Sequence, residues 1–305
     1  MTKKTSRRLY TKQIKTYRPV SRGAERWLGK PIRCLDHGFV YLVDYMGDDA
    51  SITQAARVSY GKGTKTVNED RGLIRYLRRH HHTTPFEMVE FKFHAKMPIF
   101  VARQWIRHRT ANVNEYSGRY SEMLNEFYLP EAGALRKQSV QNRQGRGDEL
   151  STEHQKLVLH MLKEEYEHSF ATYQRFLEPD INLSRELSRI GLSVANYTQW
   201  YWKIDLHNLM HFLRLRMDPH AQYEIRVYAD ALARIIRDAV PLAYEAFEDY
   251  VCNGMHISGP EKELLQKHSF PMKEKIAREI VFDRLKNKRE TEECIEKFKL
   301  LNLIE

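Results

Sequence analysis

The sequence has few cysteines, no long apolar stretch and no internal repeat. Its three cysteines, Cys34, Cys252 and Cys294, are too few and too far apart for a disulfide framework or a CxxC metal-binding motif. No apolar run approaches the roughly 20 residues needed to cross a bilayer, and the N-terminus lacks the apolar stretch of a secretory signal. We therefore expect a cytoplasmic protein in a reducing compartment, without a membrane partner.

Charge is spread unevenly along the 305 residues. Residues 1–33 hold eleven Lys or Arg and a single acidic residue, Glu25, so this arm carries the whole net charge of +10. Removing these residues from the totals of 50 basic and 40 acidic residues leaves equal numbers of each sign. We interpret residues 1–34 as a basic arm that lies in solvent or contacts another subunit. Organelle targeting and nucleic-acid binding stay open as alternatives.

The body of the chain has the composition of a globular protein, with 42% hydrophobic and 30% charged residues. Apolar and polar residues alternate strictly over 89–96, which predicts a half-buried strand, because neighbouring side chains on a strand point to opposite faces. Pro98 favours the first turn of a helix that continues to residue 108. Asp218 followed by Pro219 predicts the start of another helix, which ends near residue 238.

The remaining elements follow from the same kinds of pattern. They are strands over 38–45 and 126–129, helices over 48–58, 68–80, 158–178, 185–192 and 205–217, and loops over 110–121 and 137–148. Early strands and later helices predict an α+β fold, in which helices flank a mixed or antiparallel sheet and the C-terminal half is helical. We expect one domain over 35–255 and a charged helical extension over 256–305.

The densest group of polar side chains lies in residues 104–120, which read QWIRHRTANVNEYSGRY. Arginine guanidinium groups suit phosphate oxygens, and Glu and Asn can distinguish the N–H and C=O edges of a ring. This stretch therefore predicts a pocket for a phosphorylated ligand that also forms hydrogen bonds. A solvated basic helix end explains the same residues as well on chemistry alone. No cysteine lies nearby, so a cysteine nucleophile is not expected.

The pattern Arg107-His108-Arg109, seven residues, then Ser117 resembles the signature of the flavin-dependent thymidylate synthases. Three other segments resemble recurrent segments of that family: His82-Thr83-Thr84-Pro85-Phe86-Glu87, Leu213-Arg214-Leu215-Arg216 and Asp218-Pro219-His220-Ala221-Gln222-Tyr223-Glu224. The resemblance covers roughly residues 35–250 and leaves out the N-terminal arm and the C-terminal extension.

This resemblance implies a homotetramer whose active sites lie where subunits meet. It implies de novo synthesis of dTMP by reductive methylation of dUMP, with 5,10-methylenetetrahydrofolate as carbon donor and FAD, reduced by NADPH, as hydride source. The family uses no cysteine nucleophile, so the uracil ring must gain electron density in another way. By similarity, Arg216 is the catalytic residue, because a permanent cation beside N3 stabilises the anionic ring.

The resemblance also assigns binding residues. For dUMP these are Gln104, Trp105, Ile106, Arg107, Glu115, Tyr116, Ser117, Gly118, Arg119, Arg189 and Arg216. For FAD they are Ser59, His82, Thr84, Arg107, His108, Arg109, Glu115, Asp205, Leu206, His207 and His211. Asp205 and His211 stand where the family has other residues, asparagine in the case of Asp205. An acidic group near an electron-rich flavin requires a partner.

Two other functions compete with this interpretation. His207 and His211 are four residues apart on a predicted helix, and His80-His81-His82 adds three imidazoles, a set that could bind zinc. The HExxH motif of metallohydrolases requires Glu after its first histidine, however, and here that residue is Asn208. An RNA-binding module would suit the basic arm, but no RNP or KH signature is present. We expect neither a metal nor a nucleic-acid polymer.

Overall fold

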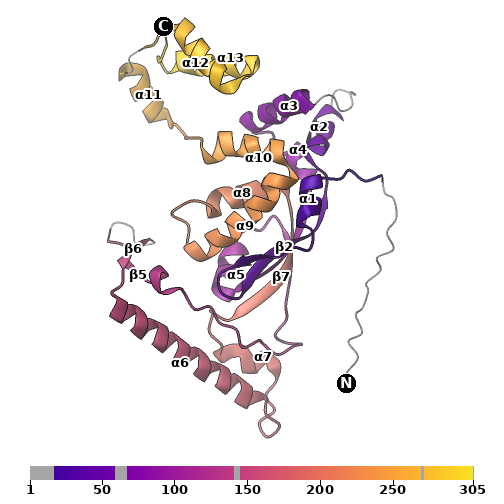
Figure 1. Cartoon of the computed structure of the whole chain (residues 1–305), viewed down its shortest axis with the longest axis vertical. Helices are drawn as coiled ribbons and strands as arrows, with labels where there is room; N and C mark the ends of the chain where they lie inside the picture. Colours follow the sequence, from indigo (N-terminus) through magenta and orange to yellow (C-terminus); the bar gives the residue numbers. More distant parts are fainter. Residues whose placement is uncertain (1–16, 59–66, 141–144, 269–270, 305) are drawn as a thin grey trace.

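A computed structural model describes residues 17–58, 67–140, 145–268 and 271–304 (Figure 1). At its centre is one antiparallel five-stranded sheet with strand order β1-β2-β3-β7-β4. The strands are β1 Ile32–Cys34, β2 Gly38–Met46, β3 Glu90–Pro98, β7 Tyr197–Asp205 and β4 Asn112–Glu115. The predicted α+β class with an antiparallel sheet is confirmed.

One face of the sheet is covered by the helices α5 (Ile99–Trp105), α8 (Leu206–Arg216) and α9 (Tyr223–Ala239) (Figure 1). The alternation predicted for β3 is confirmed, because Phe91, Phe93 and Ala95 are buried on that face. In β7 the corresponding buried residues are Trp200 and Trp202, and Trp202 pairs with Phe93. Large aromatic side chains thus form the interface between the sheet and the helices.

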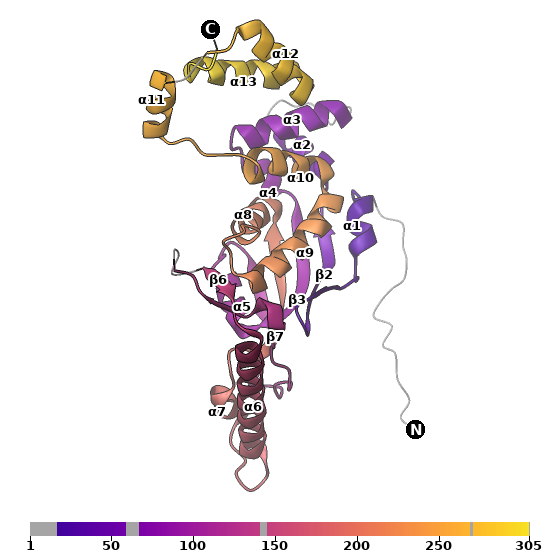
Figure 2. The same cartoon turned by 60° about the vertical axis from the view of Figure 1, so that its left-hand side comes forward.

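The other elements surround this central layer. They are α1 Arg22–Trp27, α2 Asp49–Val58, α3 Val67–Arg79, α4 Thr84–Glu87, η1 Ala132–Ala134, β5 Arg136–Gln138, β6 Arg146–Glu149, α6 Thr152–Leu177, α7 Arg185–Ser188, η2 Arg189–Gly191, α10 Pro241–Phe247, the π-helical turn η3 Glu248–Cys252, α11 Gly259–His268, α12 Glu274–Leu285 and α13 Lys288–Leu300. Both views place α6 and α7 at one end of the molecule and α11, α12 and α13 at the other (Figures 1 and 2).

One strand was not predicted, and two segments predicted as loop contain strands. The strand β7 was not predicted, although Thr198, Trp200, Trp202 and Ile204 are its inward residues. The segment 110–121, predicted as loop, contains β4, whose residues are all exposed at the edge of the sheet and show no apolar alternation. Residues in the predicted loop 137–148 contribute to a two-stranded hairpin, β5 with β6. Surface strands held by backbone hydrogen bonds leave little hydrophobic pattern in a sequence.

Element boundaries also differ from the predictions. Helix α5 ends at Trp105, three residues early, and the segment 126–129 forms only one bridge, Phe127 with Asn196. Helix α9 begins at Tyr223, because Asp218 instead closes a turn: its carbonyl accepts from Ala221 N at 2.8 Å and its Oδ1 from the backbone N–H of His220. Local capping patterns therefore place a helix start only to within a few residues.

Both predicted appendages make contact with the body. In α1, Ala24 is fully buried in the main core, and Ser21 donates from Oγ to the Ala239 carbonyl at 2.6 Å. The packed body therefore begins before the expected boundary at residue 34. The C-terminal helices have a small core of their own around Ala277 and Ile295. No helix in the described ranges is both long and apolar enough to span a membrane.

Candidate functional site

The Arg107-His108-Arg109 motif directly follows the buried end of α5. Trp105, the last residue of α5, is 0% exposed and packs against Trp200 and Trp202. The chain then turns outward, so that Arg107 and Arg109 are exposed while His108 is half-buried. The aromatic core thus fixes the point from which the motif leaves the helix.

His108 forms a hydrogen-bonded pair with Arg216 at the C-terminal end of α8. Arg216 Nε donates to His108 Nε2 at 3.1 Å, and the imidazole meets the ring of Phe212 edge-on at 4.9 Å between centroids. Burial, the Arg216 charge and the nearby His211 lower the pKa of His108 to about 4. His108 is therefore neutral near pH 7 and, since Nε2 accepts, carries its proton on Nδ1. The pair presents a single, oriented positive charge.

Asp205, at the N-terminal end of α8, has hydrogen-bond partners for its carboxylate. Its Oδ1 accepts from the backbone N–H of Asn208 at 2.9 Å, and its Oδ2 accepts from Asn208 Nδ2 at 2.7 Å. Asp205 is thus the N-cap of α8, where the partial positive charge of the helix end stabilises a carboxylate. The spacing of Asp205 and Asn208 could have predicted this cap from the sequence.

His207 and His211 lie further along the same helix. Nδ1 of His207 is buried and has no hydrogen-bond partner within the part of the chain that the structure describes. Burial, followed by the charge of Arg78, lowers the pKa of His207. Outside the gaps at 59–66, 141–144 and 269–270, no three His, Cys, Asp or Glu side chains of residues 17–304 gather closely enough to hold a metal ion.

The predicted residues His82 and Thr84 lie beside this end of α8. Both are exposed: His82 lies in the turn that joins α3 to α4, and Thr84 is the first residue of α4. Helix α4 packs against α8, and the charges of Arg78 and Glu87 both act on the pKa of His207. Ser59 lies outside the described residues.

The second half of the motif forms a separate group. Strand β4 carries the chain along β7, and Glu115 at its end accepts from Thr198 Oγ1 at 2.7 Å. A turn follows in which the Ser117 carbonyl accepts from the backbone N–H of Tyr120 at 3.2 Å. A Cβ on Gly118 would lie 2.8 Å from Sδ of Met123 and 3.1 Å from Cδ of Arg189, so a larger residue would displace these two side chains.

Arg119 and Arg189 belong to this second group. Arg119 Nε donates to Glu186 in α7 at 3.1 Å, and Arg189 begins η2 directly after α7. The Tyr116 hydroxyl donates to the Glu122 carbonyl at 2.6 Å, which closes the turn on the side of the motif. The side chains of Arg119 and Arg189 are exposed.

The structure therefore divides the predicted residues into two groups. We call them the arginine–histidine group (Arg107, His108, Arg109, His207, His211 and Arg216, with Gln104, whose amide contacts Gln222) and the serine–arginine group (Tyr116, Ser117, Gly118, Arg119 and Arg189). Among the described residues, no hydrogen bond or ion pair joins the two groups. Helix α8 covers a face of the sheet, whereas α7 lies beside α6 at one end of the molecule in both views (Figures 1 and 2).

Three other residues predicted to bind a ligand differ in their exposure. The side chains of Trp105 and Leu206 are 0% exposed, so a ligand could reach only their backbone atoms. Ile106 is partly exposed beside the motif. Sequence reasoning missed Phe212, which packs on His108, and Gln222, which contacts Gln104; neither follows a local pattern that points to a site.

Comparison with known proteins gives consistent matches. The family model described as "Thymidylate synthase complementing protein" matches residues 41–242. The flavin-dependent thymidylate synthase of Rickettsia bellii is 54% identical over 263 residues, which cover 83% of this chain and 90% of that protein. That of Ruegeria pomeroyi is 56% identical over 254 residues, covering 83% of this chain and 84% of that protein. A crystal structure of the UMP/dUMP methylase PolB from Streptomyces cacaoi, bound with 5-Br dUMP, is similar with a TM-score of 0.65 and 33% identity, covering 72% of this chain and 98% of that chain.

Proposed function

This chain belongs to the flavin-dependent thymidylate synthase family, and we propose that it makes dTMP from dUMP with FAD, NADPH and 5,10-methylenetetrahydrofolate. The observation that carries the proposal is the pairing of Arg216 with a neutral His108 at the centre of the family's signature motif. We propose the cytoplasm as the place of this reaction.

Arg216 would activate the substrate. Its Nε is engaged by His108, which leaves the remaining N–H groups of the guanidinium to face a ligand. A fixed cation beside N3 and the adjoining carbonyl of the uracil would stabilise negative charge in the ring and raise the nucleophilicity of C5. Loss of one such preorganised donor typically costs about 3–4 kcal/mol of transition-state stabilisation.

The residues present suit a flavin dinucleotide. His207 Nδ1 is a buried polar atom without a partner among the described residues, and Arg107 and Arg109 are exposed cations suited to a pyrophosphate. Thr84 at the start of α4 and His82 in the turn before it would hold the same ligand. Bound FAD, after reduction by NADPH, would supply the hydride that completes the methyl group. Neutral His108 would add no second positive charge beside Arg216.

The serine–arginine group would hold the nucleotide. The Ser117 hydroxyl, the Gly118 backbone and the guanidinium groups of Arg119 and Arg189 are donors of the kind that bind phosphate and sugar oxygens. Glycine at 118 keeps the backbone close to Arg189, which concentrates these donors in a small volume.

No cysteine is suited to attack the substrate. Burial raises the pKa of the Cys34 thiol to about 12, so it is a poor nucleophile, and it lies in β1 away from the motif. Cys252 ends η3 and Cys294 lies in α13, neither of which carries a proposed site residue. These positions support a route without a covalent enzyme nucleophile.

A homotetramer with shared active sites explains why the two groups lie apart. We propose that one nucleotide contacts Arg216 of one copy of the chain and Arg189 of another. The face of the sheet opposite the main core offers a surface for such contact, because Phe39, Tyr41 and His94 form a partly exposed aromatic cluster there. Exposed aromatic groups of this kind are common in subunit interfaces.

The experiment that tests the function measures tritium release from C5 of labelled dUMP by the FAD-loaded protein. Arg216→Ala should lower the rate by two orders of magnitude or more. Arg234→Ala, an exposed arginine on α9, serves as a matched control and should keep the wild-type rate. Full activity of Arg216→Ala would contradict the role at N3. Purified protein that binds no flavin when FAD is supplied would contradict the cofactor.

A further inference from the structure

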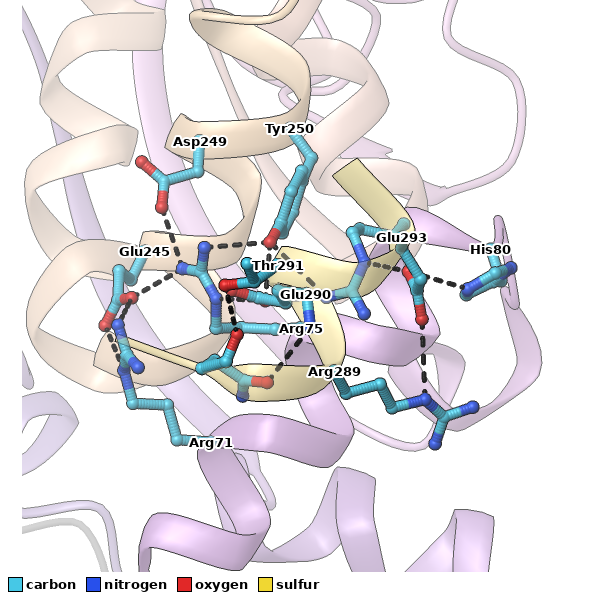
Figure 3. A network of polar contacts seen from close by, with 12 residues as sticks. Arg71, Arg75, His80, Glu245, Asp249, Tyr250, Arg289, Glu290, Thr291 and Glu293 are labelled. Atoms are coloured by element: carbon cyan, nitrogen blue, oxygen red, sulfur yellow. Dashed lines mark hydrogen bonds and ion pairs between the residues drawn. The ribbon is translucent and has the colours of Figure 1, made fainter. Parts of the chain in front are cut away.

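The C-terminal extension docks on α3 through a network of buried charges (Figure 3). Helix α13 supplies Glu290, whose side chain is 2% exposed. Its Oε1 accepts from Arg75 Nε and from Arg79 Nη1, both at 2.6 Å, and from the Tyr250 hydroxyl at 2.5 Å. Removing one partner would leave an uncompensated buried charge, so this contact between α13 and α3 is costly to break. The extension lies beyond residues 41–242, which match the family.

Contacts continue from α13 to the end of α3. Glu293 accepts from Arg79 Nε at 2.7 Å and lies 3.3 Å from His80 Nε2. The Arg289 guanidinium lies 4.0 Å from the centroid of the Tyr76 ring. The same ring lies 4.3 Å from the ring of His80 and 6.1 Å from that of His82. Side chains of α13 thus contact the end of α3 and His80 at the start of the turn, and Tyr76 links them to His82.

That turn has a conformation which its sequence does not favour. The His82 N–H donates to the Leu77 carbonyl at 3.0 Å, and the His81 N–H to the Arg78 carbonyl at 3.3 Å, the arrangement of a Schellman cap. The cap places His81 at φ 56°, in the left-handed region where glycine is the usual residue. A residue other than glycine costs free energy there, which the two cap hydrogen bonds and the surrounding contacts offset.

The turn leads directly to His82 and Thr84, and α4 packs on α8, which carries His207. We infer that the C-terminal extension is a positioning element for the flavin pocket, in which Glu293 and Arg289 hold the 80–82 turn so that His82 and Thr84 face α8. This inference rests on the proposed function, since it takes FAD as the ligand of that pocket. Glu293 and Arg289 do not contact the ligand; they act through Tyr76 and His80.

The test is a titration of the full-length apoprotein with FAD, followed by flavin fluorescence. Glu293→Ala should weaken FAD binding about tenfold, the factor expected if the free turn spends about one-tenth of its time in the binding conformation. Arg289→Ala, at a more exposed position, should weaken it in the same direction by less. At saturating FAD, kcat and the KM for dUMP should stay at wild-type values, because neither reacting group is moved.

Glu292→Ala is the matched control. Glu292 is the adjacent residue on α13, but its carboxylate binds Arg278 of α12 at 2.7 Å, within the extension. This variant should bind FAD as the wild type does. Equal affinities of the wild type and the Glu293 and Arg289 variants would overturn the inference and leave the proposed function intact. Absence of FAD binding by the wild type would overturn both. A Glu293 variant that changes kcat and the KM for dUMP as much as FAD affinity would show a general structural role and also overturn the inference.

Discussion

Asp49 should make the stability of this protein depend on pH in a direction opposite to that of most carboxylates. Its side chain is 9% exposed and caps a helix far along the chain, since its two oxygens accept from the backbone N–H groups of Leu242 and Ala243 in α10, both at 2.9 Å. Burial is the largest influence and raises its pKa from 3.8 to about 6, although the two backbone hydrogen bonds oppose the shift.

The size of the effect follows from this shift. The difference between 3.8 and about 6 corresponds to about 3 kcal/mol at about 1.4 kcal/mol per unit of pKa. Because the pKa is higher in the folded state, the stabilising contribution is fully present below pH 3.8 and is lost as the pH rises through about 6. The asparagine of Asp49→Asn cannot ionise, so the free energy of unfolding of this variant does not fall at this position as the pH rises. It keeps one acceptor oxygen and leaves one backbone N–H unsatisfied, which costs about 1–3 kcal/mol at every pH.

The assay is urea unfolding of wild type and Asp49→Asn between pH 4 and 8 at one protein concentration. Wild type should be the more stable at pH 4, and its advantage should fall by about 2 kcal/mol by pH 8, because a part of the loss has already occurred at pH 4. Other carboxylates titrate in both proteins and cancel in the difference. A difference in free energy of unfolding that stays constant from pH 4 to 8 would refute the reasoning.

Three further predictions concern the motif and the sheet. Gly118→Ala should raise the KM for dUMP with little change in melting temperature, since the new Cβ would displace the flexible side chains of Met123 and Arg189; an unchanged KM in steady-state kinetics would contradict this. Arg216→Gln should move the pKa of His108 upward from about 4 without reaching 6.5, because burial remains, and a histidine NMR titration that shows no movement would exclude the pairing. Gly38→Ala should destabilise the fold by about 1–3 kcal/mol or more, because its Cβ would lie 2.5 Å from a backbone carbonyl oxygen. If Gly38→Ala unfolds at the same melting temperature as the wild type, the prediction is wrong and the strand can shift to accommodate the new Cβ.

The elements that were predicted correctly are those with one buried face. Strand β3 and helix α2 have this pattern, and their expected ranges agree with the structure to within a few residues. Strand β7 was not predicted because Tyr201 faces outward between Trp200 and Trp202. The three successive aromatic residues hide the alternation of buried and exposed positions. Strand β4 was not predicted because all of its residues are exposed.

The candidate site shows the same limit. A motif names Arg107, Ser117 and their neighbours, but it does not reveal that β4 separates them along the sheet. The Arg216–His108 pair joins residues 108 positions apart, and the Arg75–Glu290 pair joins residues 215 positions apart. Contacts of this range depend on the complete fold, so no local pattern predicts them.

The separation of the serine–arginine group from the arginine–histidine group has a genetic consequence. In the shared sites that we propose, an Arg189 variant and an Arg216 variant would each damage a different half. When both chains are made in one cell and assemble together, some sites combine an intact Arg189 from one chain with an intact Arg216 from the other. Two inactive genes should then restore growth without added thymidine, whereas a chain that carries both substitutions should never complement itself.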